Sequence, residues 1–137
     1  MKVMLDSGAQ MPTRSHSTDA GLDLYSREER YIPPHGSEVF DTGVHIELPP
    51  NTYGKLESRS GLNINNSVVS CGGVIDQGYT GSIKVKLYNM GGGVFWVNKG
   101  MKIVQLLVVP CLYEDVEMGQ INMDTERKSN GFGSTGM

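Results

Sequence analysis

The sequence predicts an all-β fold, and three observations lead to that prediction. Glycine accounts for 18 of the 137 residues, roughly twice its usual share in proteins. Several short segments alternate apolar and polar residues, the period of a half-buried strand. No segment shows a long 3.6-residue period. Short strands joined by tight glycine-containing turns are typical of a β-barrel or β-sandwich.

The expected strands can be located by their patterns. Alternation predicts half-buried strands at 22–25, 44–48 and 83–87. The apolar run 103–109, which ends before Pro110, predicts a strand that is buried on both faces. Its one polar residue, Gln105, then needs a hydrogen-bond partner.

One short helix and a polar tail complete the expected fold. Ser60 to Asn66 is suited to a short helix, capped by Ser58 or Ser60. The chain length fits one domain. From Thr125 onward the chain is polar and glycine-rich, so it cannot bury a face of its own. We expect a barrel domain over residues 1–124 and a flexible tail over residues 125–137.

Charge and composition exclude several classes of protein. The net charge is -3 and no basic block is present, which argues against a nucleic-acid-binding surface. The two cysteines, Cys71 and Cys111, are too few for a disulfide scaffold and are expected to be reduced. No apolar run is long enough to cross a membrane, and the N-terminus lacks a signal-peptide core. We therefore expect a soluble cytoplasmic protein with no membrane partner.

Ser58-Arg59-Ser60-Gly61-Leu62 is a candidate phosphate-binding segment. Free backbone N–H groups at the start of a helix suit a phosphate, and the Arg59 guanidinium would add charge-assisted hydrogen bonds. Taken alone, an arginine in an ordinary surface turn explains the same residues.

The segment from Gly73 to Tyr79 is the candidate reactive turn. A carboxylate at a hairpin tip, with glycines on either side, leaves room for a ligand against the backbone. Asp76 could orient and deprotonate a water molecule, and the Tyr79 ring could form the floor of a sugar pocket. The alternative is that Asp76 is an ordinary turn residue.

Two further segments could serve the same ligand. Gln105 is either a satisfied core amide or a side chain directed at a phosphate or an attacking water. Arg127 and Phe132 lie five residues apart in the glycine-rich tail. Such a tail could close over a ligand and stack an aromatic ring on a base; alternatively, it is a terminus with no role.

Taken together, these segments resemble the five motifs of the trimeric dUTP diphosphatase (dUTPase) family, in the family's order. The third of them, 73–81, is the most specific, and Met11-Pro12-Thr13-Arg14 is similar to the family's opening strand. The resemblance covers nearly the whole chain. In order, the five matching segments are 20–24, 59–62, 73–81, 99–106 and 127–136.

The resemblance implies a fold, an assembly and a reaction. The fold is a distorted β-barrel or jelly roll of the β-clip type. The assembly is a homotrimer with active sites shared between subunits, and each tail closes over a neighbouring site. The reaction is hydrolysis of dUTP to dUMP and pyrophosphate with Mg²⁺, which limits uracil incorporation into DNA and supplies dUMP for thymidylate synthesis. The ion would be held mainly by substrate phosphates and water, with no protein residue as a dedicated metal ligand.

The resemblance also implies roles for individual residues. Asp76 binds the 3′-hydroxyl and positions the water that attacks the α-phosphorus. Tyr79 packs under the deoxyribose and leaves no space for a 2′-hydroxyl. The backbone from Ser70 to Ile75, which includes Gly73 and Val74, pairs with the edge of uracil, and Lys84 matches a position near the nucleobase pocket.

The remaining implied roles concern phosphates and the tail. The residues similar to the family's phosphate and water ligands are Arg59, Ser60, Gly61 and Gln105. Arg127 resembles a phosphate-binding arginine, and Phe132 resembles the aromatic residue that stacks on uracil, with Gly133 and Ser134 near the γ-phosphate. Asp23 resembles a structural or water-network carboxylate.

This sequence departs from the family pattern at a few positions, none of which removes a proposed catalytic group. Ser82 stands where the third motif often has an acidic or amide residue, and Met101 where the fourth usually has Asp. Asn63 replaces a small residue after Gly-Leu. Lys128 and Asn130 replace tail positions that are often glycine, which could alter closure of the tail.

Two other functions fit parts of the sequence. A dCTP deaminase has the same fold, but its chemistry resembles one that needs a glutamate base, where this chain has Asp76 and Tyr79. A regulatory protein that uses nucleotide binding as a switch is the second alternative, and the presence of Asp76 argues against loss of turnover.

Overall fold

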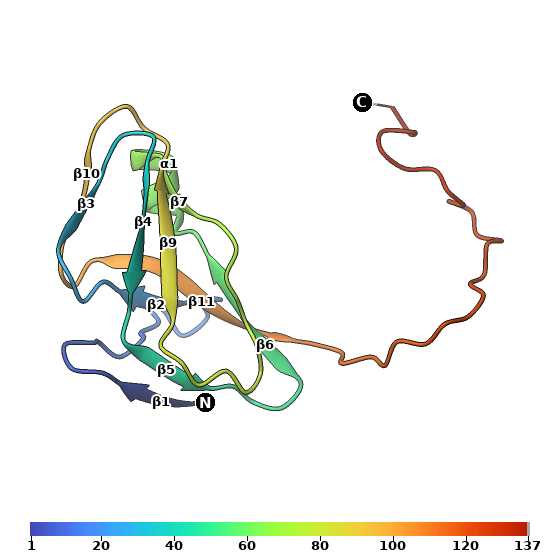
Figure 1. The fold of residues 1–137 in the computed structure, drawn as a ribbon, viewed down its shortest axis with the longest axis horizontal. Coiled ribbons are helices and arrows are strands. Elements are labelled where there is room, and N and C mark those ends of the chain that lie inside the picture. Colours follow the sequence, from blue (N-terminus) through green and yellow to red (C-terminus); the bar gives the residue numbers. More distant parts are fainter. Residues whose placement is uncertain (137) are drawn as a thin grey trace.

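The computed structural model describes residues 1–136, and within that range the chain forms eleven strands and one short helix (Figure 1). The helix, α1, spans Ser60–Asn66. The strands are β1 (Lys2–Leu5), β2 (Leu22–Tyr25), β3 (Arg30–Ile32), β4 (Ser37–Asp41), β5 (Val44–Glu47), β6 (Thr52–Glu57), β7 (Val68–Ser70), β8 (Val74–Ile75), β9 (Lys84–Asn89), β10 (Phe95–Val97) and β11 (Lys102–Pro110).

The strands form two larger sheets and two short ribbons, and every pairing is antiparallel. One sheet has the order β2-β11-β6-β8, and the other has the order β4-β9-β7. The ribbons pair β1 with β5 and β10 with β3. Neighbouring strands in each sheet are mostly far apart in sequence, as in jelly rolls. The predicted all-β barrel is confirmed.

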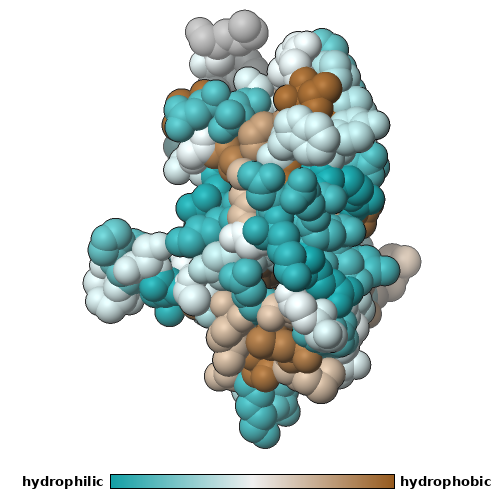
Figure 2. Space-filling model, turned by 90° about the vertical axis from the view of Figure 1, so that its left-hand side faces the viewer, coloured by the Kyte–Doolittle hydropathy of each residue, from teal (hydrophilic) through white to brown (hydrophobic). Residues whose placement is uncertain are grey.

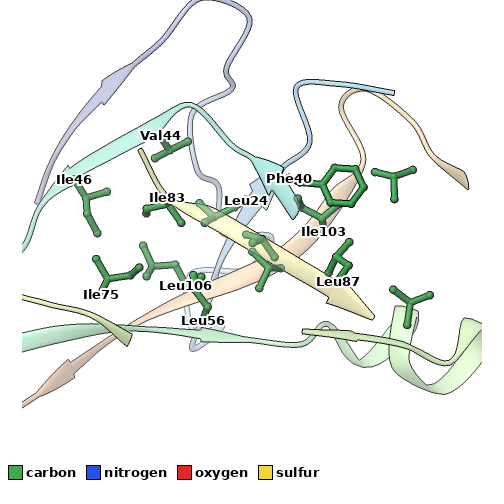
Figure 3. Close-up of a cluster of buried hydrophobic side chains, with 14 of the residues drawn as sticks. Leu24, Phe40, Val44, Ile46, Leu56, Ile75, Ile83, Leu87, Ile103 and Leu106 are labelled. Carbon is green, nitrogen blue, oxygen red and sulfur yellow. The ribbon is translucent and has the colours of Figure 1, made fainter. Parts of the chain in front are cut away.

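The hydrophobic core lies between the two larger sheets (Figure 3). Most of its members are strand residues that point inward, while their neighbours along the strand point outward. This explains the period-2 patterns in the sequence. In β5, Val44 and Ile46 are buried while His45 and Glu47 are not. In β9, Val85 and Leu87 are buried, whereas Lys84 and Lys86 are exposed. The half-buried strands expected at 44–48 and 83–87 are therefore confirmed, with small shifts at their ends. The strand expected at 22–25 is also present, but its burial does not alternate, because Asp23 and Leu24 are both buried.

Strand β11 is not buried on both faces along its length, so that prediction is wrong for its second half. Ile103 and Val104 are both buried because the pairing with β2 shifts register between Lys102 and Val104. Such a bulge turns two successive side chains inward. Beyond Leu106 the strand runs past the core, and Val108 is exposed. The apolar run thus combines a bulge with an exposed end.

The segment that carries Asp76 is not a hairpin, contrary to the sequence prediction. Strand β8 pairs with β6, whereas β9 pairs with β4 and β7 in the other sheet. Residues 76–82, which we call the Asp76 loop, therefore cross from one sheet to the other. The turn signal in the sequence is real, because the Tyr79 amide donates to the Asp76 carbonyl (3.1 Å), but the strands on either side do not pair.

The helix lies where it was predicted, but neither expected serine caps it. Its N-cap is Arg59, with extended backbone angles and no side-chain cap. Ser58 is used elsewhere, since its hydroxyl binds the main chain of Ser70. The segment before the helix is thus joined to β7 instead of capping the helix locally.

The first strand also differs from expectation. Strand β1 comprises Lys2–Leu5, whereas the expected opening strand at 11–14 contributes only an isolated bridge between Thr13 and Asp23. The bridge consists of hydrogen bonds in both directions, at 2.7 and 3.2 Å. Thr13 therefore fastens the N-terminal segment to β2 without extending the sheet.

After Pro110 the chain leaves the barrel (Figure 1). Residues 111–136 contain no strand or helix and extend away from the strands. Met137, the last residue of the expected tail, lies outside the described residues. No helix within residues 1–136 has the length and apolar character needed to cross a bilayer. On the face shown in Figure 2, apolar residues gather toward the two ends and hydrophilic residues cover the middle.

Candidate active site

A polar cavity of about 270 Å³ lies where β2, β11 and the start of α1 meet. We call it the Arg59 cavity. It brings together three of the predicted site residues, Arg59, Ser60 and Gln105, although they are far apart in sequence. The residues that line it are Ser15, Asp19, Ala20, Gly21, Asp23, Arg59, Ser60 and Gln105.

Asp23 holds two cations at the wall of this cavity. Its carboxylate oxygens contact Arg59 Nε at 3.0 Å and Lys102 Nζ at 2.8 Å. Asp23 is largely buried, with 13% of its side chain exposed, while Arg59 keeps 32% exposed. Within residues 1–136, the terminal nitrogens of Arg59 have no hydrogen-bond partner. The ion pair therefore orients the guanidinium and leaves its outer donors available for an anion.

The amide of Gln105 has the partner that the sequence required. Its Nε2 donates to the Ser58 carbonyl at 3.1 Å. Its Oε1 lies against Gly21, where an added Cβ would come within 2.3 Å of that oxygen. Only glycine fits at position 21 without displacing the amide, so the close approach of β2 fixes the direction of the Gln105 side chain.

The first turn of α1 borders the same cavity. Arg59 has φ -79° and ψ 129°, and its carbonyl accepts the first helical hydrogen bond, from the Asn63 amide at 3.0 Å. The amides of the residues before Asn63 therefore have no partner within the helix. A Cβ on Gly61 would contact nothing, so the space beside this turn is open to a ligand.

The segment from Ser70 to Ile75 is partly engaged within the chain. The Ser58 hydroxyl accepts from the Ser70 amide (2.8 Å) and donates to the Ser70 carbonyl (3.0 Å). The Leu56 amide donates to the Gly73 carbonyl (2.8 Å). Gly73 has φ +103°, and a Cβ there would lie 2.6 Å from Leu56. Within residues 1–136, the main chains of Cys71 and Gly72 are left without a partner.

Asp76 and Tyr79 lie apart from the Arg59 cavity. Asp76 is exposed, and its carboxylate has no hydrogen-bond partner within residues 1–136. Its charge, after burial and the nearby Cys111, helps to raise the pKa of Tyr113, which is consistent with Asp76 lying near the segment that directly follows β11. Tyr79 rests on Gly81, donates to the Ser82 carbonyl at 3.1 Å, and borders a different cavity.

Lys84 and the predicted tail residues do not line this cavity. Lys84 is exposed at the start of β9. The tail residues Arg127, Phe132, Gly133 and Ser134 lie in the extended segment away from the barrel (Figure 1). A single chain thus assembles the arginine, serine and glutamine but not the aspartate, tyrosine or tail.

The sequence patterns missed three polar residues of this region. Lys102 pairs with Asp23, and its Nζ also contacts the Ser15 hydroxyl at 3.1 Å. Asp19 lines the cavity, and the main-chain amide of His16 is the largest cause that keeps the pKa of Asp19 below its ordinary value. Lys102 reaches Asp23 only because β11 pairs with β2, which no local pattern around Lys102 shows. Ser15 and Asp19 lie in an irregular loop with no periodicity to place them.

Comparison with known proteins gives the family. The dUTPase family model matches residues 7–136. The deoxyuridine 5′-triphosphate nucleotidohydrolase of Gloeothece citriformis is 44% identical over 135 residues, spanning 97% of this chain and 93% of that protein. The human mitochondrial protein of that name is 42% identical over 132 residues, spanning 96% of this chain and 52% of that one.

Solved structures agree with this assignment. The dUTPase of Staphylococcus bacteriophage 80alpha with dUPNHPP superposes with a TM-score of 0.92 at 29% identity, covering 99% of this chain and 98% of that one. A mutant dUTPase from phage phi11 of S. aureus, solved with a structural Mg(II) ion, gives 0.82 at 28% identity, covering 88% of this chain and 96% of that one. The chain belongs to the dUTPase family and is a hydrolase of that family.

Proposed function

We propose that this protein hydrolyses dUTP to dUMP and pyrophosphate. The observation that carries the proposal is the Arg59 cavity, where the fold gathers Arg59, Ser60 and Gln105 around an open polar space. The Asp23 ion pair keeps the outer donors of the guanidinium free. A triphosphate offers oxygens to such donors, and charge-assisted hydrogen bonds to phosphate are strong.

Asp76 supplies the base in this proposal. The carboxylate is exposed and unpaired within residues 1–136, so it can accept a proton from water. The water oxygen forms a bond to the α-phosphorus, the bond from that phosphorus to the bridging oxygen breaks, and pyrophosphate leaves. Positioning and charge stabilisation account for most catalysis of this kind, and no covalent intermediate is needed.

In this proposal, the uracil and the deoxyribose of dUTP are recognised next to the Asp76 loop. The unpartnered main-chain groups of Cys71 and Gly72 lie between Ser70 and Gly73, whose carbonyls are already bonded. We assign the uracil edge to this stretch and to the backbone that continues into Val74 and Ile75. A pyrimidine with exchanged donor and acceptor would leave buried groups unpaired, which gives strong discrimination. Tyr79 packs under the deoxyribose.

The side chains of the Arg59 cavity suit Mg²⁺ only as an ion that arrives bound to the substrate. Both oxygens of Asp23 are taken by cations, and one oxygen of Asp19 accepts from His16. Within residues 1–136 no group of three His, Cys, Asp or Glu could hold a metal ion. Mg²⁺ favours phosphate oxygens and water, and Asp19 and Asp23 could accept hydrogen bonds from such water. The ion would neutralise phosphate charge.

A homotrimer would complete the site. The Arg59 cavity of one chain lacks Asp76, Tyr79 and the tail, so we propose that neighbouring chains supply them. The segment after Pro110 exposes large apolar side chains, which mark an interaction surface. These are Leu112, Val116, Met118, Ile121 and Met123. In this arrangement residues 1–124 act as the barrel domain, and residues 125–137 bring Arg127, Phe132, Gly133 and Ser134 over a neighbour's site.

In the cell, this reaction would take place in the cytoplasm. Removing dUTP would limit uracil incorporation into DNA, and the dUMP formed would supply thymidylate synthesis. Lys84, exposed at the start of β9, would lie near the nucleobase of a shared site.

The test is release of pyrophosphate from dUTP, dCTP, dTTP and UTP, measured in parallel with Mg²⁺. We expect turnover of dUTP alone, because the backbone edge rejects cytosine, steric contact at the methyl group rejects thymine, and Tyr79 excludes the 2′-hydroxyl. Ammonia released from dCTP without pyrophosphate would instead identify a deaminase. Binding of dUTP without any turnover would leave a regulatory nucleotide-binding protein.

A further inference from the structure

The Asp76 loop is held to the rest of the barrel by a histidine. His45 lies in β5, and its Nδ1 is 2.7 Å from the Thr80 carbonyl of that loop. Its other ring nitrogen, Nε2, is 3.1 Å from Asp6 Oδ1. The side chain is 18% exposed. One imidazole therefore joins the loop to the segment that follows β1.

Both contacts require a donated proton from the ring. A backbone carbonyl and an ionised carboxylate can only accept hydrogen bonds, whereas a neutral imidazole has one donor and one acceptor nitrogen. The neutral ring can satisfy Thr80 or Asp6, but not both. The imidazolium has two N–H groups and satisfies both at once, so this geometry matches the charged form.

Among the side-chain contacts that hold the loop within residues 1–136, this one alone can titrate near neutral pH. Gln77 Oε1 accepts from the Asn51 amide at 2.8 Å, and the Ser82 hydroxyl donates to Asp41. Neither of those contacts depends on a group that titrates near neutral pH, whereas histidine does. Thr80 directly follows Tyr79, the residue proposed to pack under the deoxyribose, so the His45 contact helps to set the position of Tyr79.

The charges that face His45 favour its protonated form. Asp6 and Asp41 both attract the ring, and Arg27 lies between them, 3.7 Å from Asp6 and 3.0 Å from Asp41. Two other charged residues on the paired strands β1 and β5, Lys2 and Glu47, pair with one another at 3.4 Å. The Thr80 carbonyl is the largest cause that raises the pKa of His45; burial, the next in size, lowers it, and Asp6 and Asp41 raise it further.

We propose that His45 is a positioning residue for dUTP binding, which holds the Asp76 loop when its ring is protonated and loosens it when the ring is neutral. The proposal rests on the proposed function, because it gives the loop its role in binding deoxyuridine. As pH rises through the pKa of His45, one of the two hydrogen bonds is lost. The KM for dUTP then increases.

The kinetic test measures kcat and KM for dUTP from about pH 5.5 to about pH 9 in the full-length protein. His45→Gln cannot carry the charge, and His45→Arg carries a donor-rich cation at every pH. His35→Asn is the matched control, because His35 lies in a turn between β3 and β4 with φ +58°, a conformation that asparagine tolerates. Ratios of variant to wild type cancel the titration of dUTP itself.

At low pH we expect the KM of His45→Gln to be about fivefold above that of the wild type, the scale of one hydrogen bond. That ratio should approach one at high pH. His45→Arg should keep the low KM at high pH, and His35→Asn should follow the wild type. A His45→Gln ratio that stays constant with pH would overturn the proposal, because a structural role alone predicts that.

A nucleotide-free measurement separates this inference from the proposed function. In NMR titrations of the protein alone, the His45 ring and the main-chain amides around Thr80 should shift with one common pKa, and the amides should stop shifting in His45→Gln. A wild-type protein that fails to hydrolyse dUTP would refute the proposed function yet leave this readout intact. If the amides around Thr80 do not shift as His45 titrates, the inference is refuted, even when the enzyme hydrolyses dUTP.

Discussion

The Arg59 cavity and the Asp76 loop are built in opposite ways. In the cavity, Asp23 binds Arg59 and Lys102 together, and Gly21 fixes the amide of Gln105. In the loop, Asp76 has no partner within residues 1–136 and faces solvent. The Arg59 cavity is preformed inside one chain, whereas the Asp76 loop is left open; under the proposed function, a neighbouring chain would bring the two together.

The largest expected effect tests which of these two regions supplies the base. Asp76→Asn should keep dUTP binding while kcat falls about a thousandfold, because a general base is removed and the shape is kept. Steady-state kinetics and calorimetric titration with a non-hydrolysable analogue measure the two quantities. Glu29→Gln, at an exposed carboxylate on the barrel, serves as the control. Near-normal turnover of Asp76→Asn would remove the proposed base.

A second prediction tests whether the two regions come from different chains. Arg59→Ala and Asp76→Asn should each be nearly inactive alone. After unfolding and refolding as an equal mixture, about a quarter of the wild-type activity should return, because random trimers pair an intact Arg59 with an intact Asp76 at that frequency. Activity that stays at the level of the separate variants would mean that each chain builds its own site.

The tail provides a smaller test of how the open region is closed. Deletion of residues 125–137 should leave a folded trimer whose kcat/KM for dUTP is lower by about tenfold or more, because Arg127 and the aromatic ring of Phe132 are lost. Circular dichroism and light scattering check the fold and assembly. If the shortened chain does not fold, the tail has a structural role in place of the proposed one.

The smallest expected effect concerns the contact that holds the loop at Ser82. Burial raises the pKa of Asp41, but hydrogen bonds from Ser82 and the Gly43 amide and the charge of Arg27 outweigh it, so the pKa lies below its ordinary value. A lowered pKa stabilises the fold above the unfolded value, and that stabilisation is lost as pH falls through the folded value. Thermal unfolding of Asp41→Asn should therefore depend less on pH in acid.

Asp115→Asn is a suitable control for that measurement, because Asp115 is exposed in the segment after the barrel. An identical acid dependence in wild type and Asp41→Asn would show that Asp41 does not anchor the loop. The acid dependence of thermal unfolding in Ser82→Ala should lie between that of the wild type and that of Asp41→Asn, since this variant removes one of the hydrogen bonds that lower the pKa of Asp41.

Local chemistry made part of this structure predictable from the sequence. Alternation identified the strands around Leu24, Ile46 and Val85, and the lone polar residue in β11 indicated that Gln105 needed a partner. The limits of α1 were also predicted, although Ser58 serves β7 and not the helix.

The failures share one cause, which is that strand pairing is not local. Nothing near Asp76 shows that β8 and β9 belong to different sheets, and nothing near Ile103 shows the bulge against β2. The same holds for Lys102, which reaches Asp23 only after β11 pairs with β2, and for His45, which contacts Thr80 from a part of the sequence 35 residues away.

The position of β11 also affects the order of events during synthesis. It is the last strand in sequence, yet it lies inside its sheet, between β2 and β6. Those two strands have no direct pairing without it, so a growing chain that ends before Lys102 lacks the middle of the sheet. Folding therefore waits until nearly the whole barrel has left the ribosome, and it relies on distant contacts, which are slow to form. Nascent chains of this protein should need protection from aggregation late in translation.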